Sequence, residues 1–170
     1  VTATAYAPPG VELPAAPDLP RMRRDRAAKL RAAMADKHVD GLVLLGNANV
    51  TYATGASWPL SDAGRANSER PVAVVLADDP VPHLFTPYLA DAAAELDLDD
   101  DHLHGPTYLD VDEGVAAFAG RLRELIGSGA NVAVDDITGA MHRDHQLLFE
   151  TWPPRSANEI TGAARIRKTP

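Results

Sequence analysis

The sequence predicts an α/β domain with a mixed central sheet and helices on both faces. Short apolar runs of strand length alternate along the chain with longer segments whose apolar residues recur at helical spacing. Two of these runs, at 71–77 and 83–86, are separated by an Asp-Asp-Pro turn, which indicates an antiparallel hairpin within the sheet. Hydrophobic residues make up 45% of the 170 residues, which is enough for one core without disulfides or metals.

The amino-terminal part combines an irregular segment with a helix. Residues 1–20 contain five prolines and no apolar period, so we expect an extended lead-in. Residues 21–37 are rich in Ala, Arg, Lys and Leu, which favour helix, and Met22, Leu30 and Met34 fall near one stripe. The sequence therefore predicts a helix over 21–37 with one buried face.

A strand and a short helix are expected next. The apolar run 42–45 follows a Val-Asp-Gly stop and has the length of a buried strand. Residues 47–55 are typical of a short helix, with Asn47 as its amino-terminal cap and Gly55 at its end. The polar segment 56–70 is expected to form a loop before the hairpin.

Downstream of the hairpin the pattern predicts elements of both types. An Ala-rich helix is expected over 88–96, an acidic turn over 97–102 and a short strand over 108–110. The apolar spacing over 111–126 predicts a helix that ends at Gly127. The remaining elements are expected to be a strand, a helix and a turn or weak edge strand, over 131–135, 140–150 and 152–158.

The net charge of −8 is distributed unevenly along the chain. Residues 21–37 carry a net charge of +5 and residues 155–170 carry +3, whereas residues 38–154 carry −14. Because an acidic body repels phosphate backbones, we expect no nucleic-acid partner. The basic run at 21–37 is more typical of a solvated helix face than of an interaction surface.

Composition limits both the chemistry and the location of the chain. It has no cysteine, which excludes disulfides, thiolate metal sites and a cysteine nucleophile within these residues. It has no apolar run of membrane-spanning length, and its first residues lack the basic and apolar regions of a signal peptide. We therefore expect a cytoplasmic location and no membrane partner.

Two histidine pairs are candidates for metal binding, and neither has the required pattern. His142 and His145 lie three residues apart on a predicted helix, whereas a zinc helix of the H-E-x-x-H type needs spacing four and a neighbouring Glu. His102 and His104 would share a face only if the chain is locally extended. Surface or helix-end histidines are the commoner interpretation of both pairs.

The acidic turn matches only the beginning of a calcium-binding loop. Asp97, Asp99 and Asp101 fall at its positions 1, 3 and 5, but the required Gly at position 6 is His102 and the required Glu at position 12 is Tyr108. We therefore expect a solvated acidic turn, with no tight metal site and no cofactor in this chain.

Two aspartates end the predicted strand over 131–135. Ligands of open α/β sheets bind at the carboxyl ends of strands, so Asp135 and Asp136 could serve as a phosphoacceptor or as metal ligands. Capping of the following helix by Asp136 is the commoner use of such a residue.

A large aromatic residue stands in the polar segment 56–70. Loops this long within a domain are usually functional or mobile, and Trp58 is accompanied there by Arg65 and Arg70. Trp is a frequent anchor at interfaces, and Arg binds carboxylates through two parallel hydrogen bonds. One interpretation is that these three residues contact a substrate or a partner subunit, and the other is that Trp58 folds back over the sheet.

Several segments occur in a characteristic order. A basic helix, RDRAAKLRAAM, leads into HVDGLVLLG and then ANVTYATG, and the chain later continues with NVAVDD and RIRKTP. This order resembles the amino-terminal domain of the creatinase/prolidase/aminopeptidase P family. The resemblance covers roughly residues 21–170, and PDLPRMRRDR together with YAT is weakly similar to family members that act as lyases on sulfonium compounds.

Two motifs carry the resemblance with small departures. The family's N-(V/I)-x-Y-L-(T/S)-G turn is filled by Asn49 to Gly55, with Ala53 in place of Leu. Its closing L-R-x-I-K-(S/T)-P segment is filled by Arg165 to Pro170, with Arg instead of an apolar residue before the Lys.

The resemblance implies a fold for this domain and a separate domain for catalysis. It implies a ribonuclease H-like three-layer fold for residues 21–158, with 159–170 starting a linker to a carboxyl-terminal "pita-bread" domain. That second domain holds two divalent metal ions through two Asp, one His and two Glu, none of which matches a residue of this chain. In this family the amino-terminal domain supports a homodimer and often lends loop residues to the partner's active-site mouth, where the segment with Trp58 is expected.

The favoured hypothesis is therefore a non-catalytic amino-terminal domain of a metal-dependent hydrolase similar to Xaa-Pro dipeptidase, aminopeptidase P or creatinase. The alternative is a stand-alone α/β binding or signalling module that uses Asp135 and Asp136. That module would need a Lys on a later strand, yet no Lys occurs between Lys37 and Lys168. The ending RIRKTP is also expected where a second domain follows. Xaa-Pro peptides, creatine-like amidines and sulfonium compounds are all compatible substrates of the whole protein.

Overall fold

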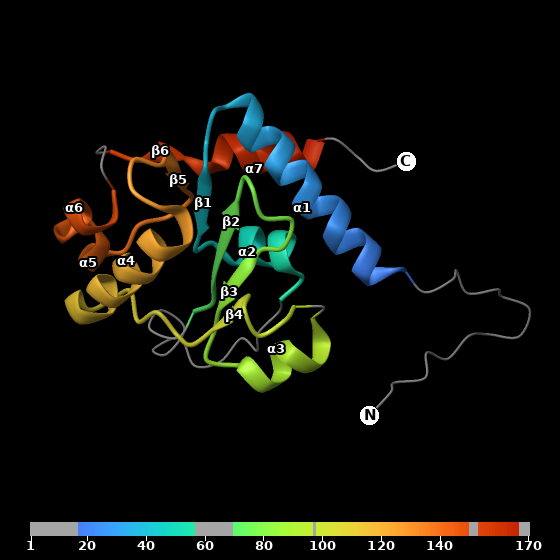
Figure 1. Ribbon diagram of the computed structural model, residues 1–170, viewed down its shortest axis with the longest axis horizontal. Helices are drawn as coiled ribbons and strands as arrows, with labels where there is room; N and C mark the ends of the chain where they lie inside the picture. Colours follow the sequence, from blue (N-terminus) through green and yellow to red (C-terminus); the bar gives the residue numbers. More distant parts are fainter. Residues whose placement is uncertain (1–16, 57–69, 97, 150–152, 167–170) are drawn as a thin grey trace, which may run out of the picture.

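A six-stranded mixed sheet lies between two layers of helices in the computed structural model (Figure 1), which describes residues 17–56, 70–96, 98–149 and 153–166. The strands are β1 (Gly41–Leu44), β2 (Val72–Leu76), β3 (His83–Phe85), β4 (Leu103–His104), β5 (Val132–Val134) and β6 (Arg155–Ser156). Their order across the sheet is β4-β3-β2-β1-β5-β6. β2 pairs antiparallel with both β1 and β3, whereas β5 pairs parallel with β1 and β6, and β4 pairs parallel with β3. The predicted hairpin is thereby confirmed.

The helices divide between the two faces of the sheet. They are α1 (Leu19–Asp36), α2 (Asn47–Thr54), α3 (Leu89–Glu95), α4 (Asp112–Ile126), α5 (Gly139–Arg143), α6 (His145–Leu148) and α7 (Ala157–Ile166). Buried residues of α1, α2, α3 and α7 form one hydrophobic cluster with the sheet, and those of α4, α5 and α6 form the other. The predicted α/β class with helices on both faces is therefore confirmed.

The apolar run 42–45, which includes most of β1, contributes side chains to both hydrophobic clusters. Leu42 and Leu44 belong to the cluster under α1, and Val43 and Leu45 belong to the cluster under α4. Successive side chains of a strand point to opposite faces, so a strand covered by helices on both sides must be apolar throughout. This explains why the run 42–45 has no polar alternation.

The predicted strand over 108–110 is wrong. Tyr108 has a φ of 49°, a left-handed conformation that an extended strand cannot contain, and the chain turns there before α4. The carbonyl of Leu109 accepts a hydrogen bond from Thr138 Oγ1 instead of joining a strand ladder. The edge strand next to β3 is formed earlier, by Leu103 and His104.

The predicted helix over 140–150 is two helices. α5 ends and α6 begins at Asp144, whose backbone lies at φ −103° and ψ 28°. The cap of α5 is Thr138, whose Oγ1 accepts a hydrogen bond from the N–H of Met141, so the proposed cap Asp136 is also wrong. Local apolar spacing predicted the helical character but could not locate the break.

The boundaries of α2 are set by two glycines. Gly55 ends the helix in the left-handed region at φ 79°, as the sequence predicts. Asn47 is inside the helix rather than its cap, because Gly46 occupies the cap position. A Cβ on Gly46 would lie 2.9 Å from Asp135 Oδ2, so the close approach of that carboxylate requires glycine.

Helix α7 lies beside α1 on one face of the sheet (Figure 1). Ile160 and Ala164 of α7 are buried in the same hydrophobic cluster as Leu30 and Met34 of α1. Residues 157–166 thus share the core of the preceding domain. The predicted division at residue 158 concerns a longer protein and stays a prediction.

Candidate functional site

The carboxylate of Asp135 fastens the end of β5 to the turn between β1 and α2. It accepts hydrogen bonds from the backbone N–H of Leu45 at 2.7 Å, from the backbone N–H of Gly46 at 3.1 Å and from Asn49 Nδ2 at 2.7 Å. Three donors aimed at one carboxylate are a strong, partly buried arrangement. Its oxygens are thereby committed to holding the fold.

Residues of helix α2 bind α7, the last described helix. Arg165 Nη2 donates to Asn49 Oδ1 at 2.6 Å and to the carbonyl of Ala48 at 2.8 Å, and Tyr52 Oη donates to the carbonyl of Ala164 at 3.1 Å. The Arg165 guanidinium also lies over the Tyr52 ring, 5.2 Å from its centroid. The two motifs named from sequence therefore meet in space, with Asn49 bridging Asp135 and Arg165.

Of the three residues predicted at a substrate mouth or partner contact, only Arg70 lies in the described part of the chain; Trp58 and Arg65 lie outside it. Arg70 Nη1 forms an ion pair with Asp136 Oδ2 at 3.1 Å, and its side chain is 19% exposed. The Nε atom of Arg70 is buried and has no hydrogen-bond partner among the described residues. Arg70 thus anchors the chain that follows the Trp58 segment to the end of β5.

The second aspartate after β5 is occupied as well. Besides the ion pair with Arg70, the carboxylate of Asp136 accepts a hydrogen bond from the N–H of Ile137 at 2.8 Å. Neither aspartate therefore presents an unengaged carboxylate of the kind a phosphoacceptor needs, which argues against the stand-alone signalling module.

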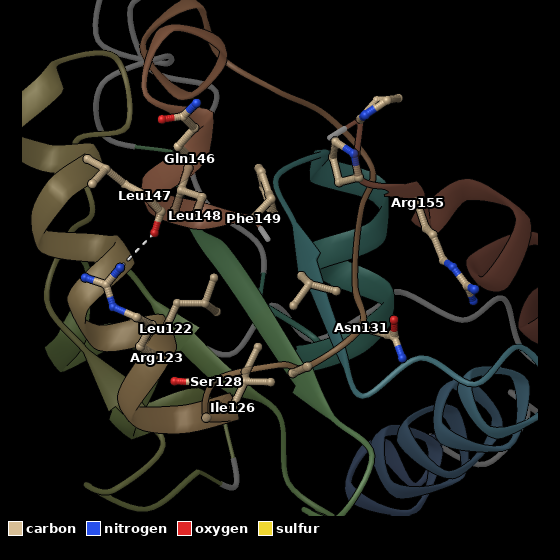
Figure 2. Close-up of a pocket in the computed structure, with 15 residues that line it drawn as sticks. Leu122, Arg123, Ile126, Ser128, Asn131, Gln146, Leu147, Leu148, Phe149 and Arg155 are labelled. Carbon is tan, nitrogen blue, oxygen red and sulfur yellow. Dashed lines mark hydrogen bonds between the residues drawn. The ribbon is translucent and has the colours of Figure 1, made fainter. Parts of the chain in front are cut away.

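A pocket of about 410 Å³ opens between α4, α6, β5 and the segment before β6 (Figure 2). Its walls combine apolar and polar groups, and Arg123, whose Nη1 donates to the carbonyl of Leu147 at 3.0 Å, borders it. Arg155 and Asn131 add polar groups, but the residues that line the pocket include no carboxylate and no histidine. This pocket is suited to contact rather than to acid–base or metal chemistry.

The predicted histidine candidates separate into two groups. His142 and His145 lie on different helices on either side of Asp144, and His145 Nδ1 lies 3.1 Å from the carbonyl of His142. His102 and His104 come together with His83, a residue that the sequence reasoning did not single out. The His83 ring stacks on both, with centroids 4.7 Å from His102 and 5.2 Å from His104.

The surroundings of the histidine cluster, formed by His83, His102 and His104, shift the pKa values of its members in different directions. Burial, and then the nearby charge of His102, lowers the pKa of His83 below its usual value. Burial and the neighbouring His83 lower the pKa of His104 to about 4. Burial alone would also lower the pKa of His102, but hydrogen bonds to Asp99 and Asp79 outweigh it and raise that pKa. His104 is therefore neutral at pH 7, and His83 binds a proton less readily than an ordinary histidine does.

Asp79 completes this cluster and was also missed in the sequence reasoning. Its Oδ2 lies 3.2 Å from His102 Nε2 and 3.7 Å from His83 Nε2, while its Oδ1 accepts from the N–H of Val81 at 2.8 Å. The available signal was the predicted hairpin, which places Asp79 in the turn and His83 at the start of the returning strand. The third member, His102, comes from the acidic turn. The sequence could not place it beside Asp79 and His83, because that depends on the order of strands in the sheet.

The family model described as the creatinase/prolidase N-terminal domain matches residues 26–158 of this chain. No curated protein sequence matches this chain. None of the described helices combines the length and the apolar character needed to cross a membrane.

Solved structures share the fold at low sequence identity. A proline dipeptidase from Streptococcus pneumoniae tigr4 aligns with a TM-score of 0.59 and 19% identity, over 84% of this chain and 98% of that chain. Dipeptidase PepE from Mycobacterium ulcerans aligns with a TM-score of 0.62 and 20% identity, over 91% of this chain but 39% of its own. The prolidase from Pyrococcus horikoshii OT3 aligns with a TM-score of 0.56 and 16% identity, over 85% of this chain and 36% of its own.

Proposed function

The chain belongs to the creatinase/prolidase N-terminal domain family, and we propose that it is the non-catalytic amino-terminal domain of a metal-dependent hydrolase. The proposed hydrolase is similar to Xaa-Pro dipeptidase, aminopeptidase P or creatinase, and its carboxyl-terminal domain holds two divalent metal ions. In this proposal the present domain supports a homodimer and shapes one side of a substrate pocket. Structural neighbours that are named as proline dipeptidases and aminopeptidase P support the assignment.

The observation that carries this proposal is the use of the motif residues. Tyr52 donates to the carbonyl of Ala164, and Arg165 donates to Asn49 Oδ1 and to the carbonyl of Ala48, so α2 and α7 are joined by three hydrogen bonds. These contacts fix the direction in which the chain leaves the sheet. In the proposed hydrolase, these contacts hold in place the helix from which the chain continues toward the second domain.

The segment with Trp58 supplies the proposed contact with a substrate pocket. Arg70 follows this segment directly and is held by Asp136, so its guanidinium serves as an anchor at the base. We assign the outward contact to Trp58 and Arg65, with the indole covering one side of the pocket and the guanidinium meeting a carboxylate. The pocket itself belongs to the partner subunit in the proposed homodimer.

The proposal extends to location and to other partners. The absence of cysteine is in keeping with a cytoplasmic location. The charge of −14 on residues 38–154 is in keeping with the absence of a nucleic-acid partner.

The isolated 170-residue chain is expected to fold but not to hydrolyse peptides, because the proposed catalytic metal ligands belong to another domain. Purified chain should be assayed on Xaa-Pro dipeptides with added manganese, cobalt or zinc. Turnover that persists through re-purification would contradict the proposal, since a contaminating peptidase would be lost in that step.

Trp58→Ala in the longer protein is expected to lower kcat/KM by roughly 30-fold, which corresponds to about 2 kcal/mol for loss of an interface anchor. The effect should fall on substrate binding and positioning, while the melting temperature of the isolated domain changes little. Steady-state kinetics and thermal unfolding of both proteins test this. A large loss of domain stability with unchanged kinetics would show that Trp58 is a core residue.

A further inference from the structure

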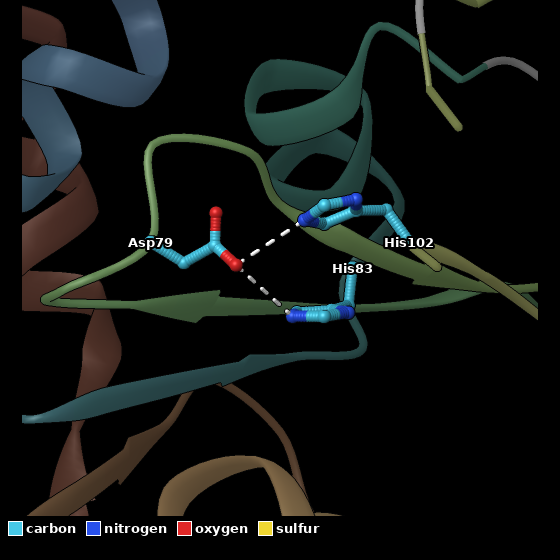
Figure 3. A group of neighbouring side chains, drawn as sticks. All are labelled: Asp79, His83 and His102. Carbon is cyan, nitrogen blue, oxygen red and sulfur yellow. Dashed lines mark hydrogen bonds and ion pairs between the residues drawn. The ribbon is translucent and has the colours of Figure 1, made fainter. Parts of the chain in front are cut away.

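Three potential metal ligands meet where the β2–β3 turn approaches the turn before β4 (Figure 3). Within the described part of the chain, Asp79, His83 and His102 each offer one ligand atom, and these atoms lie within 4.8 Å of one another. We propose that Asp79 Oδ2, His83 Nε2 and His102 Nε2 form a binding site for one divalent transition-metal ion, with Zn²⁺ as the best-suited ion.

The distances between the ligand atoms are close to those of a coordinated site. Zinc bonds of about 2.0–2.1 Å in a tetrahedron place neighbouring ligand atoms roughly 3.3 Å apart. Asp79 Oδ2 lies 3.2 Å from His102 Nε2 and 3.7 Å from His83 Nε2. Figure 3 shows both imidazole rings directing a nitrogen toward this carboxylate oxygen. The two rings are stacked with 29° between their planes, so binding one ion requires the two histidines to approach each other and one ring to rotate.

The strongest single observation is a buried nitrogen that makes no hydrogen bond of normal geometry. His83 is only 5% exposed, and its buried Nε2 has no hydrogen-bond partner among the described residues. Its Nδ1 is already engaged, 3.0 Å from His104 Nε2. At 3.7 Å the Asp79 oxygen is too far for a hydrogen bond. A bound cation would satisfy this nitrogen, whose burial without a partner is otherwise costly.

Other polar groups already orient the three ligands. Asp99 Oδ1 lies 2.5 Å from His102 Nδ1, which leaves His102 Nε2 as the atom that faces Asp79. His104 holds the Nδ1 of His83 in the same way, and the N–H of Val81 holds Asp79 Oδ1. Metal-binding histidines usually donate their second ring nitrogen to a carboxylate or another acceptor, which fixes the ring and raises its affinity.

The donor set selects the class of ion. Two imidazole nitrogens and one carboxylate oxygen suit Zn²⁺ and its first-row neighbours, whereas Ca²⁺ and Mg²⁺ require oxygen ligands. Three protein ligands leave a fourth position for water or an outside group. The ion would join the turn at Asp79 to the turn at His102, and so would cross-link strands β3 and β4 at the edge of the sheet.

This inference replaces the sequence-based expectation that the chain has no tight metal site. That expectation considered ligands that are close in sequence, namely the His142/His145 and His102/His104 pairs and the Asp97–Asp101 turn. Asp79 and His83 belong to the hairpin, and His102 follows 19 residues after His83. Their proximity therefore depends on the parallel pairing of β3 with β4.

The test is zinc titration of the 170-residue chain without a histidine tag. We expect one-to-one binding with a Kd below about 10 μM by calorimetry. A hundredfold excess of zinc over Kd should raise the melting temperature by about 5 °C or more, because the ion binds only the folded state. Ca²⁺ and Mg²⁺ should give neither effect. NMR signals of the His83 and His102 rings should shift, and those of His142 should not.

Variants assign the site and separate it from other histidines. Asp79→Asn and His102→Ala should each weaken zinc binding at least tenfold, and Asp99→Asn should weaken it by about tenfold through the loss of orientation. The matched control is the double variant His142→Ala/His145→Ala, which should bind zinc like the unaltered chain. Absence of zinc binding, or binding that survives Asp79→Asn and His102→Ala but is lost in the control, would overturn the proposal. These outcomes are independent of whether the chain belongs to a hydrolase.

Discussion

Asp135→Ala is expected to lower the free energy of unfolding by about 3 kcal/mol, because it leaves the donors that the carboxylate now satisfies without a hydrogen-bond acceptor. The N–H groups of Leu45 and Gly46 and the amide of Asn49 would all lose their acceptor. Leu45 is 1% exposed, so water cannot replace the lost carboxylate at that N–H without opening the structure. Urea unfolding of the 170-residue chain measures the change.

The adjacent residue provides the matched control for this substitution. Asp136→Ala removes the same side chain one position later, but the Asp136 side chain is 54% exposed and its ion pair with Arg70 is near the surface. Its loss should cost about 1 kcal/mol or less. Equal losses of stability in the two variants would show that Asp135 does not have the structural role assigned to it. Asp135→Asn keeps one acceptor oxygen and should fall between them.

Gly114→Ala is expected to destabilise the domain by about 3 kcal/mol, the upper part of the range for overpacking a buried position. A Cβ at Gly114 would lie 2.1 Å from the carbonyl oxygen of Tyr108 and 2.8 Å from that of Thr107. Both atoms are backbone, so no side chain can rotate away. The turn through Tyr108 would have to move, and it carries the buried Leu109 and its hydrogen bond from Thr138.

The same helix offers a second glycine as a control. A Cβ on Gly120 would have no heavy atom within 4 Å apart from the adjacent residues and the backbone of its own helix, so Gly120→Ala gains helix propensity without a clash. We expect it to stabilise the chain by up to about 1 kcal/mol. Thermal unfolding of both variants should therefore shift in opposite directions. A Gly114→Ala variant as stable as the unaltered chain would mean that α4 does not approach the 107–108 backbone this closely.

Much of the fold could be predicted because its signals are local. The helix with buried Leu30 and Met34, the helix over 111–126 and the 71–86 hairpin each follow from apolar spacing and turn residues within a few positions. The errors arose where a neighbour decides the conformation. Leu109 is buried as a strand residue would be, but the positive φ of Tyr108 turns the chain. The break at Asp144 likewise interrupts a continuous helical pattern.

The candidate site was predicted less completely than the fold. The sequence drew attention to Asp135 because it ends a strand, and to Arg165 through a motif, but it assigned neither a partner. Asn49 connects them, because α2 carries it within hydrogen-bond distance of both Asp135 and Arg165. Trp58 and Arg65 lie outside the described residues, so their proposed contact stays a prediction.

By itself the sequence determined the order and type of most elements, the α/β class and the family, since these depend on residue types at short and regular spacing. Only the tertiary structure decided which polar groups meet. Asp135 forms a hydrogen bond with Asn49, 86 residues away in the sequence. His83 lies beside His102 because β3 pairs with β4 in the sheet. Such contacts depend on the order of strands in the sheet, and strand order follows from how whole faces pack together rather than from any local pattern.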